Sequence, residues 1–159
     1  MFKFARIRAE TVAMPLSAAL FPSLDSAAES DCASRRKGAV LLVEDEATLA
    51  ELLTHLLARV QVEVIHTPSG ALALQTFHAR RDEIALAFVD CHLPDMDGRA
   101  LSQKLREAAP GLPLLLTSGR DQRSLEAVFA AGGPTGYLPK PYMPGEVLRR
   151  VTMLLNASA

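Results

Sequence analysis

Carboxylates, hydroxyls and one ammonium stand at the ends of apolar runs in this sequence of 159 residues. In chain order they are Glu44, Asp45 and Glu46, then Asp90, then Thr117 and Ser118, and finally Lys140. Clustered carboxylates raise one another's pKa unless a cation intervenes. Oxygen ligands without a histidine or cysteine partner suit a hard ion, Mg²⁺ above all. With a lysine and a hydroxyl beside it, such a set can neutralise a phosphoryl group that a carboxylate attacks.

These groups act together only if the elements that carry them bring the run ends to one place. The apolar runs lie at 39–43, 62–66, 84–90, 113–119 and 135–140. Helical spacing of apolar residues recurs between and after them, at 49–57, 69–79, 99–108, 125–129 and 147–155. Strands that are apolar throughout are typical of a parallel sheet covered on both faces. We therefore expect a doubly wound α/β domain over 38–157, with a site beyond the carboxyl ends of its strands.

Composition excludes several classes of protein. Hydrophobic residues make up 49%, enough for a core, and the net charge of −1 argues against a nucleic-acid binder held by bulk charge. No apolar run approaches the roughly 20 residues that cross a bilayer, so we expect no membrane contact. Cys32 and Cys91 give no disulfide framework, which indicates a reducing compartment and hence the cytoplasm. Residues 1–37, rich in Ser, Ala and Pro from residue 15 onward, are predicted to be a flexible extension.

Four motifs stand at the predicted strand ends: VEDE (43–46), VDCHLPDMDG (89–98), LLTSG (115–119) and YLPKP (137–141). In this order they resemble the receiver domain of bacterial two-component response regulators. The resemblance covers nearly everything after the extension. It implies a flavodoxin-like (βα)5 fold with a five-stranded parallel sheet in strand order 2-1-3-4-5.

The resemblance also implies the roles of the acidic residues. Asp90 is identified as the phosphoacceptor, and Glu44 and Asp45 as the pair that holds Mg²⁺, with Asp45 the more direct ligand. The backbone carbonyl of His92 is a further implied metal ligand. The family's usual acidic pair is two aspartates, and glutamate in the first place is a common variation.

Three more residues match the family's phosphate-binding and switching positions. Thr117 resembles the hydroxyl that moves onto the phosphoryl group, and Lys140 resembles the phosphate-pairing lysine that precedes a cis-proline turn. Tyr137 resembles the aromatic residue whose rotamer follows Thr117, although a half-buried packing role is also open. Gly119, two residues after Thr117, offers no side chain to position a hydrolytic water.

The sequence thus predicts a single-domain response regulator, because it ends at Ala159, soon after the fifth helix. A sensor histidine kinase or a histidine phosphotransfer protein would donate the phosphoryl group, with Mg²⁺ as cofactor. We expect a phosphoacceptor with self-phosphorylation and slow autodephosphorylation chemistry rather than a turnover enzyme. Its partners would be a downstream protein and, as in many family members, a second copy of itself, and not nucleic acid or a membrane.

Other interpretations of the same residues remain to be separated. A receiver fold that docks partners without phosphorylation is the alternative, although the complete acidic set argues against it. A hydrolase that works through an aspartyl phosphate needs an acid where His92 stands. The Cys91–His92 pair lacks the second Cys/His pair of a zinc site. A dinucleotide site lacks its glycine-rich turn after the first strand.

Overall fold

The sheet is parallel and has the predicted strand order. The computed structural model describes residues 38–119 and 132–157. Its strands are β1 (Ala39–Val43), β2 (Glu63–Thr67), β3 (Ile84–Asp90), β4 (Leu114–Ser118) and β5 (Thr135–Pro139). They form one sheet in the order β2-β1-β3-β4-β5, and every neighbouring pair is parallel. The predicted flavodoxin-like, doubly wound fold is therefore confirmed.

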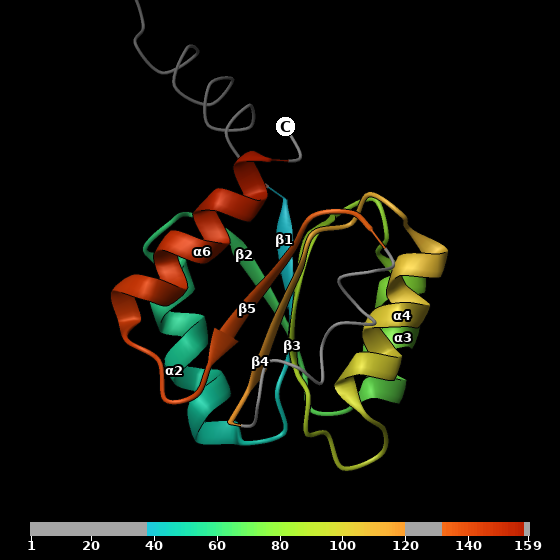
Figure 1. The fold of residues 1–159 in the computed structure, drawn as a ribbon, viewed down its shortest axis with the longest axis horizontal. Helices are drawn as coiled ribbons and strands as arrows, with labels where there is room; N and C mark the ends of the chain where they lie inside the picture. Colours follow the sequence, from blue (N-terminus) through green and yellow to red (C-terminus); the bar gives the residue numbers. More distant parts are fainter. Residues whose placement is uncertain (1–37, 120–131, 158–159) are drawn as a thin grey trace, which may run out of the picture. The chain divides into compact units, whose positions relative to one another are not determined.

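Helices cover both faces of this sheet. The described helices are α2 (Ala47–Ala58), α3 (Gly70–Ala79), α4 (Gly98–Ala108) and α6 (Pro144–Asn156). α2 and α6 lie on one face, and α3 and α4 lie on the other (Figure 1). The helix predicted around 125–129 and the extension predicted over 1–37 lie outside the described residues. Within the described ranges, no helix combines the length and the hydrophobicity that a membrane span requires.

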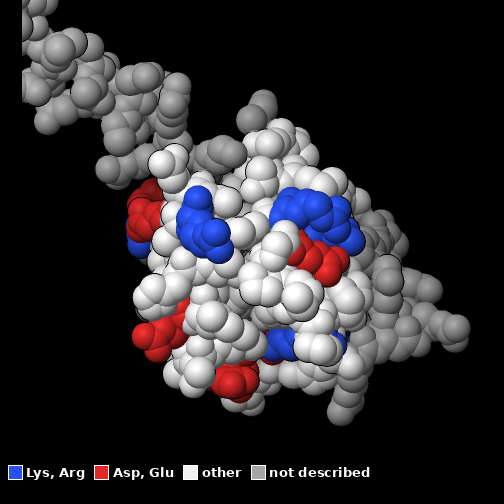
Figure 2. All heavy atoms as spheres, turned by 90° about the vertical axis from the view of Figure 1, so that its left-hand side faces the viewer, with Lys and Arg blue, Asp and Glu red and all other residues white. Residues whose placement is uncertain are grey.

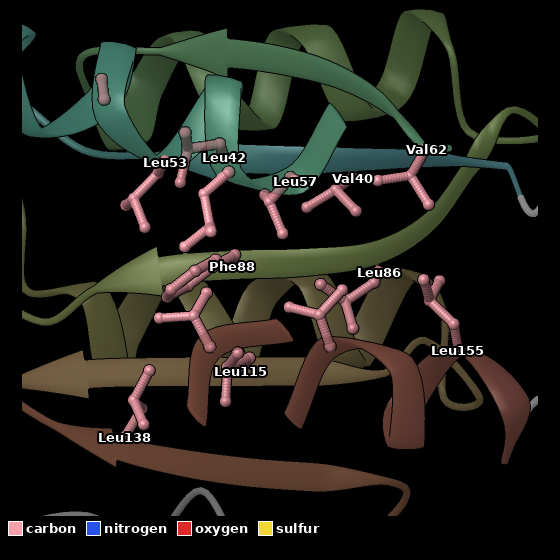
Figure 3. Packing of buried hydrophobic residues seen from close by; sticks show 14 residues of the cluster. Val40, Leu42, Leu53, Leu57, Val62, Leu86, Phe88, Leu115, Leu138 and Leu155 are labelled. Atoms are coloured by element: carbon pink, nitrogen blue, oxygen red, sulfur yellow. The ribbon is translucent and has the colours of Figure 1, made fainter. Parts of the chain in front are cut away.

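The two faces hold two separate hydrophobic clusters because strand side chains alternate in direction. In β1, Leu41 and Val43 pack on the side of α3 and α4, whereas Val40 and Leu42 pack on the side of α2 and α6. Figure 3 shows this second cluster, in which side chains of the sheet meet those of both helices. All five residues of β1 are buried, which explains why the run reads as apolar throughout.

Charged side chains are scattered over the outer side of the layer that α2 and α6 form. In Figure 2, which views the side of α2 and α6, small blue and red groups are separated by wide uncharged areas. The described surface on this side therefore carries no extended patch of one sign, in keeping with the balanced composition of the chain.

A buried arginine ties α4 to β5 at the sheet edge where the strands begin. The side chain of Arg106 donates hydrogen bonds to the carbonyl oxygens of Pro110 (3.0 Å), Leu112 (2.8 Å) and Pro134 (3.3 Å). It also donates to the hydroxyl of Thr135 at 2.7 Å. The residue is only 6% exposed, and burial lowers the pKa of its guanidinium. Its hydrogen bonds join the loop before β4 to the turn before β5.

The position of Arg106 explains why one of two adjacent residues is a glycine. Gly132 and Gly133 have φ values of 77° and 78°, a region that L-residues rarely adopt. A Cβ on Gly133 would collide with the guanidinium of Arg106, whereas a Cβ on Gly132 would meet no described atom. A side chain at either position would therefore strain the backbone, but only a side chain at position 133 would also collide with Arg106.

We expect Gly133→Ala to destabilise the protein more than Gly132→Ala. Both variants lose about 1 kcal/mol or slightly more through the positive φ. Gly133→Ala also displaces Arg106 and leaves buried acceptors unpaired, which costs about 1–3 kcal/mol more. Urea unfolding of both variants measures the difference, and equal losses would show that Arg106 is not held against this turn.

Candidate functional site

The parallel topology places four chemically active residues at one edge of the sheet. Glu44 directly follows β1, Asp90 ends β3, and Lys140 directly follows β5. Thr117, near the end of β4, is in register with Asp90 on the neighbouring strand. Because β1, β3, β4 and β5 are consecutive in the sheet, the ends that carry these groups are adjacent. The expected convergence of these residues is observed.

Lys140 bridges two buried carboxylates from distant parts of the chain. Its Nζ lies 2.6 Å from Oδ2 of Asp90 and 3.0 Å from Oε2 of Glu44. The side chains of Glu44 and Asp90 are 3% and 6% exposed, and that of Lys140 is 25% exposed. An ammonium shared by two carboxylates in this setting compensates part of their desolvation. The peptide bond between Lys140 and Pro141 is cis, as the resemblance implies.

A third carboxylate completes an acidic group that one lysine cannot neutralise. Oxygen atoms of Glu44, Asp45 and Asp90 lie within 4.8 Å of one another, and Asp45 is exposed. Glu46, by contrast, is the exposed N-cap residue of α2 and lies outside this group. Three carboxylates facing one ammonium leave two negative charges, and all the donor atoms are oxygens. This donor set fits a divalent hard cation such as Mg²⁺.

The pKa values in the site reflect this crowding. Burial raises the pKa of Glu44 above its ordinary value, and the nearby charge of Asp90 adds to this, although Lys140 acts in the opposite direction. For Lys140, burial lowers the pKa, but hydrogen bonds and charge attraction to Asp90 and Glu44 outweigh it and leave the pKa raised. Burial therefore opposes the charge on Glu44, whereas the two carboxylates favour the charge on Lys140.

The loop after β3 wraps around the phosphoacceptor candidate. The backbone N–H of His92 donates to Oδ1 of Asp90 at 3.0 Å, so that both carboxylate oxygens of Asp90 have donors. His92 pairs with Asp97 in an antiparallel bridge, which folds the loop back on itself. A pocket of about 510 Å³ lies between Asp45 and residues 91–97 of this loop. The pocket borders the acidic group and gives a ligand access to it.

Cys91, within the same loop, is not a metal ligand of this site. The residue is 8% exposed and belongs to the hydrophobic cluster under α3 and α4. Burial, with help from the charge of Asp90, raises the pKa of its thiol to about 12. A thiol that resists ionisation is a poor zinc ligand. This buried setting disfavours the thiolate form that a zinc ligand needs.

The two residues expected to switch lie on adjacent strands. Thr117 is buried, and its hydroxyl has no hydrogen-bond partner among the described residues. Tyr137 is half-buried, and its hydroxyl donates to the backbone carbonyl of Ser118 at 3.2 Å. A buried hydroxyl without a partner is costly and can accept or donate to an incoming group. Thr117 is thus placed beside Asp90 with unused hydrogen-bonding capacity.

Several supporting residues carry no clear signal in the sequence. Nε2 of His66, an exposed residue of β2, donates to the carbonyl of Glu44 at 2.8 Å. A Cβ on Gly98 would collide with the carbonyl of Asp90. Both contacts depend on how β1, β2, β3 and α4 meet in space. Pairing of the first two strands with Val43 opposite Thr67 brings His66 near Glu44, and a prediction of this register from the sequence could have revealed the contact.

Fold and site together define a signalling domain built to present one aspartate beside a lysine and an acidic pair. Comparison with protein-family models agrees, because the response regulator receiver domain matches residues 40–152. The chain therefore belongs to the response regulator receiver domain family, as its motifs implied. Its curated relatives include the response regulator RppA of Synechocystis and a putative two-component response regulator, ARR21, of Arabidopsis thaliana.

Individual relatives give the extent of the similarity. The TcrX protein of Mycobacterium tuberculosis is 34% identical over 117 residues, which are 74% of this chain and 49% of that protein. The sensory transduction protein RegX3 of Mycolicibacterium smegmatis is 32% identical over 120 residues, 76% of this chain and 51% of that protein. The chain thus spans about half the length of the curated relatives it matches.

A solved structure with similar sequence has the same architecture. The crystal structure of a response regulator from Chloroflexus aurantiacus is 33% identical and gives a TM-score of 0.66. The match covers 75% of this chain and 98% of that one. The chain therefore resembles this response regulator in sequence as well as in fold.

We expect Lys140→Met to be less stable than the wild type by about 1–3 kcal/mol at neutral pH in EDTA, because Glu44 and Asp90 lose their shared donor. Lys140 lowers the pKa of Glu44 in the wild type, so its loss raises this pKa further, and the folded variant takes up the proton at higher pH than the folded wild type does. The stability difference should therefore narrow as the pH falls through that raised pKa. Urea unfolding at a series of pH values measures it.

Lys104→Met is the matched control, because Lys104 is exposed on α4 and outside the site. This variant should match the wild type at every pH. A gap between Lys140→Met and the wild type that stays constant down to the ordinary glutamate value of 4.5 would contradict the electrostatic account.

Proposed function

We propose that this chain is a response regulator that accepts a phosphoryl group on Asp90 from a phosphohistidine, in a Mg²⁺-dependent reaction. The observation that supports this most directly is the position of Lys140, whose ammonium bridges Asp90 and Glu44 at the mouth of the acidic group. Hydrogen bonds from the N–H of His92 and from Lys140 hold the Asp90 carboxylate in a fixed orientation. Such orientation favours attack by one defined oxygen.

In the proposed transfer, an Asp90 oxygen forms a bond to phosphorus while the phosphorus–nitrogen bond of the donor histidine breaks. The electron pair of that bond returns to the ring nitrogen of the donor, which takes up a proton. Asp90 becomes an acyl phosphate, and Lys140 remains close enough to pair with the transferred group. The chain acts as a phosphoacceptor rather than as a turnover enzyme.

Glu44, Asp45, Asp90 and the backbone carbonyl of His92 are the residues that we propose to hold Mg²⁺. The bound ion would neutralise a phosphoryl oxygen and thereby lower the charge repulsion between donor and acceptor. Two uncompensated negative charges in the acidic group support this assignment. The pocket between Asp45 and the loop after β3 supports it further, since it leaves space beside the carboxylates.

The phosphoryl group would then change the protein-binding face through Thr117 and Tyr137. A shift from 1:99 to 99:1 between two states needs about 5.5 kcal/mol of differential interaction. Charge-assisted hydrogen bonds contribute about 1.5–3 kcal/mol each, so bonds from Thr117 and Lys140 to the phosphoryl group supply most of this amount. The unpartnered hydroxyl of Thr117 supports its role, because it forgoes no existing bond.

The partners in this proposal are a sensor histidine kinase or a histidine phosphotransfer protein as donor, and a downstream protein or a second copy of the chain as target. We place the reaction in the cytoplasm, in keeping with the cysteine content. The receiver domain in this proposal spans 38–157, and residues 1–37 precede it. Phosphorylation-independent docking is the competing function that the following experiment excludes or supports.

We expect acetyl phosphate with Mg²⁺ to add the mass of one phosphoryl group to the intact chain, and EDTA to prevent the addition. Asp90→Asn should show no gain because the nucleophilic oxygen is lost. Intact-mass spectrometry measures both results. Asp82→Asn, an exposed aspartate in the turn between α3 and β3, is the control and should gain the mass normally. No gain by the wild type would favour the docking module instead.

We expect Thr117→Ala to accept the phosphoryl group but to respond weakly to it, because the bond that biases the switch is missing. Thr117→Ser keeps a hydroxyl and should respond as the wild type does. The readout is the change in backbone amide NMR shifts of β5, around Tyr137, on phosphorylation. Thr117→Ala shifts as large as those of the wild type would remove Thr117 from the switch.

A further inference from the structure

The loop after β3 is also attached to α3, a helix that contributes no proposed metal ligand. The two carboxylate oxygens of Asp95 accept hydrogen bonds from the backbone N–H groups of Gly70 (2.9 Å) and Ala71 (2.8 Å). These are the first two residues of α3, whose N–H groups have no partner within the helix. Asp95 therefore satisfies the N-terminus of a helix 24 residues earlier in the chain.

A second contact of the same loop reinforces this attachment. The side chain of Met96 lies against Gly70 so closely that a Cβ there would be 2.6 Å from its sulfur. The carboxylate of Asp95 also faces the positive end of the α3 dipole, and the hydrogen bonds from Ala71 and Gly70 hold its pKa below the usual value. Polar and apolar contacts thus fix the apex of the loop to α3 from outside the site.

The position of this attachment relates it to the proposed metal site. Asp95 and Met96 line the same pocket as Asp45 and His92. At its other points the loop is held by the Cys91–Gly98 hydrogen bond, by the His92–Asp97 bridge and by Asp97, which caps α4. Those contacts close the loop on itself but do not fix it relative to α3. Asp95 alone among these aspartates bonds to an element outside the loop and α4.

We propose that Asp95 is a positioning residue that sets the affinity of the site for Mg²⁺ by anchoring the loop that carries the His92 carbonyl to the N-terminus of α3. This inference rests on the proposed function, since it assumes that the site binds Mg²⁺. Residues that orient metal ligands change the affinity although they do not touch the ion.

The test is the dissociation constant of Mg²⁺, measured by isothermal calorimetry on the full chain. We expect Asp95→Ala to weaken Mg²⁺ binding about tenfold, the lower end of the range for outer-shell partners. Asp95→Asn keeps one acceptor oxygen and should fall between the wild type and Asp95→Ala. Backbone amides of Gly70 and Ala71 should exchange their hydrogens faster in Asp95→Ala, which reports the lost anchor independently of the metal.

Two controls separate anchoring from other effects. Ser69→Ala removes the N-cap of the same helix, whose Oγ accepts from the N–H of Leu72, but leaves the loop attached. Its Mg²⁺ affinity should equal that of the wild type. Measurement at low and at high salt detects a plain charge effect, because salt screens the attraction between an exposed carboxylate and the ion. The anchoring effect should persist at high salt.

The outcomes are distinct. Equal Mg²⁺ affinity of Asp95→Ala and the wild type overturns this inference and leaves the proposed function intact. The inference is likewise overturned if Asp95→Asn and Asp95→Ala have the same Mg²⁺ affinity and their difference from the wild type vanishes at high salt. It is also overturned if Ser69→Ala weakens Mg²⁺ binding as much as Asp95→Ala does. Absence of Mg²⁺ binding by the wild type overturns both the inference and the proposed metal site.

Discussion

The buried ion pair of Lys140 with Asp90 and Glu44 is the interaction on which the site depends. The three groups come from the ends of β5, β3 and β1, so they meet only when β1, β3, β4 and β5 are assembled. An ion pair in such a setting is balanced closely between desolvation cost and charge attraction. Because of that balance, a small change in charge at Asp90 would alter which contacts of Lys140 are favoured.

The fold supports this site through close backbone packing as much as through side chains. Gly98 lies directly against the carbonyl of Asp90, so that α4 can begin beside the end of β3. Asp97 caps that helix, and Asp95 accepts hydrogen bonds from the first two N–H groups of α3, whose N-cap is Ser69. The short acidic loop thereby satisfies the ends of two helices on one face of the sheet. The loop between Asp90 and Gly98 looks like a simple turn in the sequence, but its contacts with β3, α3 and α4 constrain its residues in the structure.

Much of this arrangement could be predicted from residue patterns, and the limits are physical. Runs such as AVLLV and IALAFVD predict buried parallel strands, and parallel strands bring Glu44, Asp90, Thr117 and Lys140 to one edge. Burial pattern and topology are encoded locally, so the fold and the central site could be predicted. The bond from His66 to Glu44 and the bond from Asp95 to α3 depend on loop geometry and distances in space, which no local pattern specifies. Aspartates 95 and 97 look alike in the sequence, yet they accept hydrogen bonds from the N-termini of different helices.

Arg106, which is buried, and Lys140, which is half-buried, show how two partly desolvated cations differ in their partners. Arg106, at the edge where the strands begin, is surrounded by neutral carbonyls and a hydroxyl in fixed loop positions, so its guanidinium has no competing partner to move toward. Lys140, at the opposite edge, is bound to two carboxylates that also suit a metal ion and, in one case, a phosphoryl group. The planar guanidinium favours a rigid set of bonds, whereas an ammonium on a flexible stem accepts rearrangement. The edge where the strands begin is therefore held by a guanidinium with neutral partners, and the edge where they end by an ammonium with charged ones.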